Sequence, residues 1–183
     1  MSEPNFVAMR VAAVVVDPET KSPVLILRVI EDSAVYLPIF IGHLEATAIA
    51  AFLANMEVGR PMTHDLFVNV MAKTGWTLEQ IAVTKIVDNT FFAELTLRSS
   101  DGQVEVVDAR PSDSVALALR SGARIAVAQE VLEQAGGRQP QEPEESEGSP
   151  ESEMDEEETA RPVLDANTDL ESVDPELFGK YKM

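Results

Sequence analysis

A short pattern that occurs twice constrains this chain more than any other feature of its sequence. Residues 45–50 read EATAIA and residues 113–118 read DSVALA, so both copies run acid, small, β-branched, alanine, aliphatic, alanine. Each copy follows an apolar run that is typical of a strand. A separation of 68 residues is too long for a solenoid repeat. The pattern therefore predicts two related halves, each with one carboxylate, Glu45 or Asp113, in the first turn of a helix.

Apolar periodicity predicts the same order of elements in both halves. Alternating apolar residues indicate strands, and apolar residues three and four positions apart indicate helices. The expected strands cover about residues 5–16, 24–30, 35–41, 76–87, 90–98 and 103–108, and the expected helices cover about 44–56, 63–73, 113–121 and a last segment ending near 134. Thr63 and Ser112 are residue types typical of helix N-caps. Three strands followed by helices, twice over, predict one compact α+β domain over residues 1–136 with a mixed or antiparallel sheet.

The composition changes abruptly after Gly136-Gly137. Residues 138–160 are mostly Glu, Pro, Ser and Gln, with almost no apolar side chains to bury. Such a segment cannot offset the entropy lost on ordering, so we expect a disordered acidic tail over residues 137–183. Apolar residues return in residues 163–183, which we interpret as a short motif that docks on this domain or on a protein partner.

Charge and cysteine content exclude several classes of protein. The net charge is −18, of which residues up to Gly137 carry −7 and the remainder −11. No basic patch of the kind that drives sequence-independent coating of nucleic acid is present. The chain has no cysteine, hence no disulfide or thiolate zinc site. No apolar stretch approaches membrane-span length, and the first residues lack the basic flank of a signal peptide; we expect a cytoplasmic protein without membrane association.

Two further segments combine Arg-Pro with a carboxylate near an expected helix start. Arg60-Pro61 precedes His64-Asp65, and Asp108 and Arg110-Pro111 precede Asp113. An arginine can hold phosphate bidentately, and helix N-termini favour anions. Carboxylates can hold Mg²⁺ or Mn²⁺, while a histidine can act as a general base near neutral pH. These residue types together suit phosphodiester chemistry.

Structural interpretations of the same residues remain open. An acid in the first turn of a helix is favourable through the helix dipole alone, which accounts for Glu45 and Asp113. Arg60 and Arg110 can form ion pairs that lock the two halves together, and His64 can be a polar residue at a solvated helix end. No HExxH, Walker-type or GxGxxG pattern supports a metalloprotease or a nucleotide-binding loop.

Three segments, residues 37–46, 60–66 and 108–120, resemble the signature segments of the bifunctional nuclease domain family. The resemblance covers about residues 6–136 in the family's order and leaves the tail outside. It implies a compact α+β domain that cleaves both DNA and RNA. The alternative function is a non-catalytic interaction or regulatory module in which the arginines and acids form a structural seam between the halves.

The resemblance assigns roles to eight polar residues. The catalytic candidates are His64, Asp65, Asp113 and Glu45; the candidates for contact with substrate phosphate are Arg60, Arg110 and Arg120; the candidate ligands for Mg²⁺ or Mn²⁺ are Asp65, Asp108 and Asp113.

Sheet edges left by three strands in each half must be covered or paired. We therefore also expect a homo-oligomer, the common way to cover them.

Overall fold

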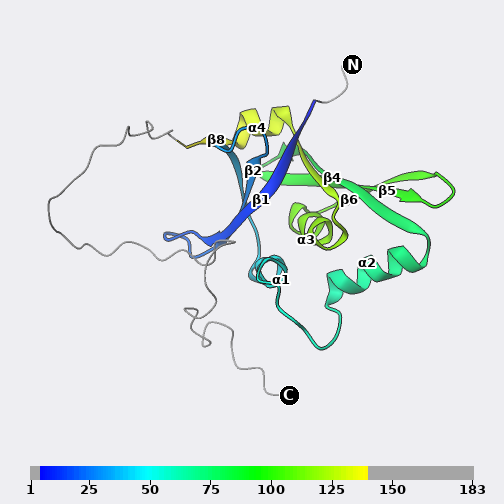
Figure 1. Cartoon of the computed structure of the whole chain (residues 1–183). Coiled ribbons are helices and arrows are strands. Elements are labelled where there is room, and N and C mark those ends of the chain that lie inside the picture. Colours follow the sequence, from blue (N-terminus) through cyan, green and yellow to red (C-terminus); the bar gives the residue numbers. More distant parts are fainter. Residues whose placement is uncertain (1–4, 140–183) are drawn as a thin grey trace, which may run out of the picture.

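Two three-stranded meanders, each followed by a helix, build the domain (Figure 1). The computed structural model describes residues 5–139. The first meander and its helix are β1 (Phe6–Val16), β2 (Pro23–Val29), β3 (Val35–Phe40) and α1 (His43–Leu53), and the second are β4 (Trp76–Val87), β5 (Thr90–Ser99), β6 (Val104–Ala109) and α3 (Pro111–Ser121). The helix α2 (Thr63–Lys73) links the halves, and β7 (Arg124–Ala128), α4 (Gln129–Ala135) and β8 (Gly137–Arg138) follow α3.

All eight strands form one mixed sheet in the order β6-β5-β4-β7-β1-β2-β3-β8. β7 lies between the two meanders, antiparallel to β1 and parallel to β4, and the other neighbours are antiparallel. The meanders therefore flank β7 from opposite sides. The α+β class and the duplicated order of three strands then a helix are confirmed.

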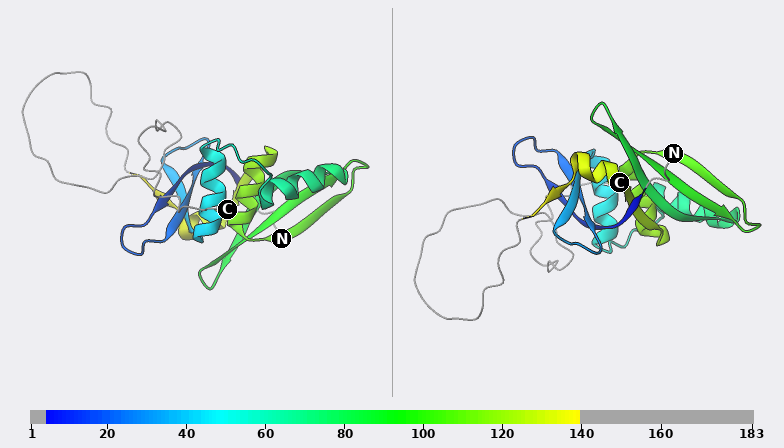
Figure 2. Two further views of the ribbon diagram at one scale, coloured as in Figure 1. Left: turned by 90° about the horizontal axis from the view of Figure 1, so that it is seen from below. Right: turned by 90° about the horizontal axis from the view of Figure 1, so that it is seen from above.

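The core lies between the sheet and its helices. Alternate residues of the strands point to opposite faces, and Leu27 of β2 and Leu37 of β3 are fully buried on the inner face. Ile49 of α1 and Val115 of α3 are fully buried in the same apolar cluster. Burying one such side chain stabilises a fold by about 1.5–3 kcal/mol. α1 and α3 lie side by side and α2 packs against α3 (Figure 2), so the two halves share this core.

The first turns of α2 and α3 begin earlier than the sequence predicts. Met62 and Arg110 occupy the N-cap positions, so the expectation that Thr63 and Ser112 cap these helices is wrong. Pro111 accounts for the shift in α3, because its fixed φ and missing N–H suit the first helical position. Ser112 consequently lies in the second position.

The sheet continues past residue 136. Gly137 and Arg138 pair with Tyr36 and Val35 of β3, and Arg138 forms an ion pair with Asp32 at 3.1 Å. The expected tail beyond residue 139, including the apolar motif at 163–183, lies outside the described residues. Within residues 5–139, no helix has the length and apolarity needed to cross a membrane.

Candidate functional site

The first three helices carry an acid at the same position. Glu45 of α1, Asp65 of α2 and Asp113 of α3 are each the third residue of their helix. A carboxylate there is favoured by the partial positive charge of the helix N-terminus. The equivalence of Glu45 and Asp113, expected from the repeated pattern, is thus present in the structure, and Asp65 adds a third example.

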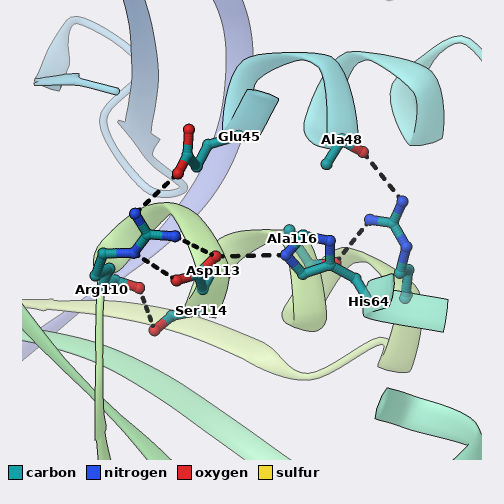
Figure 3. Close-up of polar contacts among 8 residues, drawn as sticks. Glu45, Ala48, His64, Arg110, Asp113, Ser114 and Ala116 are labelled. Atoms are coloured by element: carbon teal, nitrogen blue, oxygen red, sulfur yellow. Dashed lines mark hydrogen bonds and ion pairs between the residues drawn. The ribbon is translucent and has the colours of Figure 1, made fainter. Parts of the chain in front are cut away.

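Arg110 joins the two repeated carboxylates (Figure 3). Its Nη1 lies 2.8 Å from Oε1 of Glu45, while its Nε and Nη2 lie 2.7 and 3.1 Å from the two carboxylate oxygens of Asp113. The side chain of Arg110 is 65% exposed, whereas those of Glu45 and Asp113 are 20% and 32% exposed. The carboxylates therefore hold a guanidinium that remains accessible to solvent.

His64 reaches the same cluster from α2. Its Nε2 lies 3.5 Å from Oδ1 of Asp113 (Figure 3), at the outer limit of a hydrogen bond. Nδ1 forms no hydrogen bond with any described residue. We call Glu45, His64, Arg110 and Asp113 the Arg110 cluster; its members come from the N-terminal ends of three helices.

The charge state of Asp113 follows from its neighbours. Burial alone would raise the pKa of Asp113, but hydrogen bonds from Arg110 and the contact with His64 outweigh that effect and hold it below the ordinary value. The same pairing with Asp113 raises the pKa of Arg110. Both groups are therefore charged at neutral pH, so Asp113 is an acceptor that can orient the imidazole ring of His64.

Arg120 and Asp65 form a second, enclosed pair. Arg120 Nε lies 2.5 Å from Oδ1 of Asp65, and its other nitrogens donate to the carbonyl oxygens of Ala48 and Ala116. Its side chain is only 6% exposed, and its guanidinium carbon lies 5.4 Å from the centre of the Phe52 ring. Arg120 thereby links α1, α2 and α3, with little surface left for a ligand.

Asp65 also fixes the start of α2. One carboxylate oxygen accepts the N–H of Met62 at 2.8 Å while the other contacts Arg120. Burial works to raise the pKa of Asp65, yet these two donors lower it below the ordinary value. Because His64 directly precedes Asp65, this anchoring sets the position of the imidazole.

An open pocket of about 360 Å³ adjoins the Arg110 cluster. Glu45 and Arg110 line it together with Phe40, Gly42 and Phe91. Sequence reasoning missed Gly42, although a glycine directly before a helix with an acid three positions later was a usable signal. A Cβ at this position would collide with Oε2 of Glu45, so the glycine leaves room for the carboxylate to fold over the helix start.

Two candidates lie apart from both arginine pairs. Arg60 is exposed in the bend before α2, and Asp108 is exposed on β6. Within residues 5–139 neither forms an ion pair. The structure therefore brings six of the eight candidates into two neighbouring groups and leaves these two outside.

The described residues do not present a preformed metal site. They contain no group of three or more His, Asp or Glu side chains placed to hold an ion. A guanidinium already lies between Glu45 and Asp113, and another occupies Asp65. The donor set present in residues 5–139 thus does not fit a bound Mg²⁺ or Mn²⁺.

Sequence comparisons bear on the same region. Residues 25–139 match the family described as Bifunctional nuclease domain. An uncharacterized protein of Mycobacterium tuberculosis (strain H37Rv) is 42% identical over 128 residues, which are 70% of this chain and 75% of the relative. Bifunctional nuclease 1 of Arabidopsis thaliana is 28% identical over 100 residues, 54% of this chain and 31% of the plant protein. Bifunctional nuclease 2 of Oryza sativa subsp. japonica is 26% identical over 107 residues, 57% and 33% of the two chains.

Fold and comparison agree on the class of protein. The α+β fold matches what the signature segments imply. The chain belongs to the bifunctional nuclease domain family, whose match covers more than half of its length. It spans about a third of the length of the plant nucleases it matches.

Proposed function

We propose that this protein hydrolyses phosphodiester bonds in DNA and RNA at the Arg110 cluster. The observation that carries the proposal is the exposed guanidinium of Arg110, which is held by Glu45 and Asp113 and lines an open pocket together with Glu45. His64 does not line this pocket and contacts the cluster through Asp113. The pocket lies at the N-terminal ends of α1 and α3, where backbone dipoles favour a phosphate. The names of the plant relatives support the same chemistry.

Arg110 binds the scissile phosphate through the nitrogen surface that its carboxylate partners leave open. A guanidinium stabilises the negative charge that accumulates on the phosphoryl oxygens as the water oxygen attacks phosphorus. Glu45 and Asp113 fix its orientation from two sides, so little reorganisation is needed when substrate arrives. Arg60, exposed at the start of α2, contacts a neighbouring phosphate.

His64 acts as the general base. With Nε2 turned to Asp113, Nδ1 is the ring nitrogen that accepts the proton of the attacking water. The bond from phosphorus to the leaving oxygen then breaks, and solvent water protonates that oxygen. Asp113 stabilises the imidazolium that forms. Asp65 and Arg120 position α2 and α3, and thereby His64, without touching substrate.

Substitution of His64 tests the mechanism, and the chain supplies a matched control. His43, the other of its two histidines, is exposed at the start of α1 outside the Arg110 cluster. General-base catalysis is worth about 10²–10⁴-fold in rate, so His64→Ala should cut cleavage of labelled single-stranded DNA and RNA, assayed with Mg²⁺ and Mn²⁺, by at least a hundredfold. His43→Ala should retain wild-type rates. Equal rates for both variants would refute the role of His64.

A second function is favoured by a different observation. Arg110 links α1 to α3 and Arg120 links all three helices, as expected for a structural seam in a non-catalytic interaction or regulatory module. The two functions differ in what Arg110→Lys does. Loss of cleavage with an unchanged melting temperature supports the nuclease, while loss of stability in a protein that never cleaves supports the module.

A further inference from the structure

Two arginines and a tyrosine lie in a row across three neighbouring strands. Arg10 of β1 is directly opposite Arg28 of β2, and Arg28 is directly opposite Tyr36 of β3. Residues opposite one another in a sheet project from the same face. Met9 and Leu27, the neighbours of Arg10 and Arg28 in the sequence, are buried in the core on the other face.

No acid in the described part of the chain pairs with either arginine. Within residues 5–139 neither Arg10 nor Arg28 forms an ion pair; Arg28 only donates one hydrogen bond to the carbonyl oxygen of Ser33, at 3.0 Å. Like charges directly opposite each other destabilise a sheet. An anion from outside the domain would remove this repulsion.

The row lines an open pocket of about 550 Å³. Tyr36 lies against β8, where a Cβ at Gly137 would collide with the phenol ring. The glycine thus lets the backbone of β8 support the ring. A supported aromatic ring beside two guanidinium groups that form no ion pair within residues 5–139 is the combination that binds the base and phosphates of a nucleotide.

β3 connects this pocket with the Arg110 cluster. Tyr36 and Phe40 are four residues apart on β3, so their side chains share a face, with about 13 Å between them along the strand. Phe40 is 62% exposed and lines the pocket that contains Glu45 and Arg110. The aromatic rings of Tyr36 and Phe40 thus lie on one face of β3, between the pocket that contains Arg10 and Arg28 and the pocket that contains Arg110.

We propose that this face of β3 is a binding track for single-stranded nucleic acid. Arg10 and Arg28 hold backbone phosphates, bases stack on Tyr36 and Phe40, and the strand leads to Arg110. Bases in a duplex are stacked on one another and cannot lie on these rings, so the track selects single strands. The proposal rests on the nuclease function proposed above, since it assigns that site a substrate class.

The test measures binding separately from cleavage. Fluorescence anisotropy with a labelled twelve-nucleotide oligo-dT is followed in full chains that all carry Asp113→Asn, to suppress any cleavage. Arg10→Ala and Phe40→Ala should each weaken binding at least fivefold. Arg10→Ala should also reduce the salt dependence by about 0.7 in log–log slope, whereas Phe40→Ala should leave the slope unchanged.

Matched controls come from the surface of α2. Lys73→Ala removes an exposed positive charge, and Phe67→Ala removes an aromatic ring that is 48% exposed. Both should bind within twofold of the parent protein. If Arg10→Ala and Phe40→Ala behave like these controls, or if duplex DNA binds as tightly as oligo-dT, the track does not exist.

If the track does not exist, Arg10 and Arg28 bind another anion. Gln139 lines the same pocket, and residues 140–160, which follow it directly, contain ten acids. Failure of the nuclease proposal would look different: the chain without Asp113→Asn would not cleave, yet binding would still depend on Arg10 and Phe40. Cleavage with binding unaffected by either variant would overturn the track alone.

Discussion

Arg110 and Arg120 each face a carboxylate at a helix start, yet their surroundings give them different roles. Arg110 is 65% exposed and shares its guanidinium between Glu45 and Asp113, whereas Arg120 is 6% exposed and donates to Asp65 and two carbonyl oxygens. A phosphate cannot reach a guanidinium that is enclosed in this way. Arg110 therefore belongs to the chemistry that we propose, and Arg120 to the framework.

Removing Arg120 should be costly for stability. Arg120→Ala leaves Asp65, whose side chain is 30% exposed, with only the N–H of Met62 as a donor. Breaking a fully buried pair costs about 3–5 kcal/mol, so we expect a cost at the lower end of that range. Denaturant unfolding should show a loss of about 3 kcal/mol. Arg60→Ala, which removes an exposed arginine without an ion pair in residues 5–139, should change stability by less than about 0.5 kcal/mol. Equal effects would contradict the framework role.

Acid should weaken the fold by protonating the carboxylates of Asp65 and Asp113. Asp65 and Asp113 have pKa values below the ordinary value of an aspartate, about 4. They therefore stabilise the folded state above that pH, and this contribution disappears as the pH falls through their lowered pKa values. The free energy of unfolding should fall as the pH drops below about 4. Asp65→Asn should make that fall shallower. A pH-independent stability in this range would show that the pairs do not form.

At the scale of elements, Gly42 at the start of α1 leaves space for the side chain of Glu45. Gly42 has φ of −77°, which alanine adopts without strain, but an added Cβ would displace the flexible carboxylate of Glu45. Gly42→Ala should therefore keep the melting temperature within a few degrees while lowering cleavage severalfold, because Arg110 loses one of its two supports. Ala54→Gly, at the other end of α1, should not affect cleavage. Unchanged cleavage by Gly42→Ala would remove Glu45 from the site.

Sequence periodicity predicted β1 to β6 and the four helices, because half-buried strands and helices leave a regular spacing of apolar residues. It did not predict β7, a short strand between the two meanders, or the two-residue β8. The repeated pattern also located Glu45 and Asp113 at equivalent helix positions. The sequence pattern did not predict contacts between elements. Arg120 donates to the carbonyl oxygen of Ala48, 72 residues away, while Arg110 stays exposed, and the residues next to each arginine in the sequence do not indicate this difference. The row of Arg10, Arg28 and Tyr36 depends on strand register, which a single sequence does not specify.

At the scale of the whole molecule, one edge of the sheet formed by residues 5–139 is unpaired. β6 is the last strand on its side of the sheet, and Val104, Val106 and Val107 are 47%, 56% and 43% exposed. The opposite edge ends in the two-residue β8. Unpaired backbone groups beside exposed valines favour pairing with another chain, in line with the homo-oligomer that we still predict.

Sedimentation velocity tests the oligomer at micromolar concentration. The full chain should sediment as a dimer or larger assembly, and Val106→Lys, which places a charge on this edge, should shift it toward monomer. Leu44→Lys, at an 82% exposed position on α1, is the matched control and should sediment like the unaltered chain. A monomer without any substitution would contradict the prediction.

Cleavage by the full chain and by Asp113→Asn is the most direct test of nuclease activity at the Arg110 cluster. The amide keeps the size of the carboxylate but removes the charge that holds Arg110 and orients His64. The unaltered chain should cut both single-stranded DNA and RNA, Asp113→Asn should lose at least a hundredfold in rate, and Asp88→Asn, in the exposed turn between β4 and β5, should lose nothing. Highly purified protein that cuts neither substrate, or Asp113→Asn that cuts as fast as the unaltered chain, would contradict it.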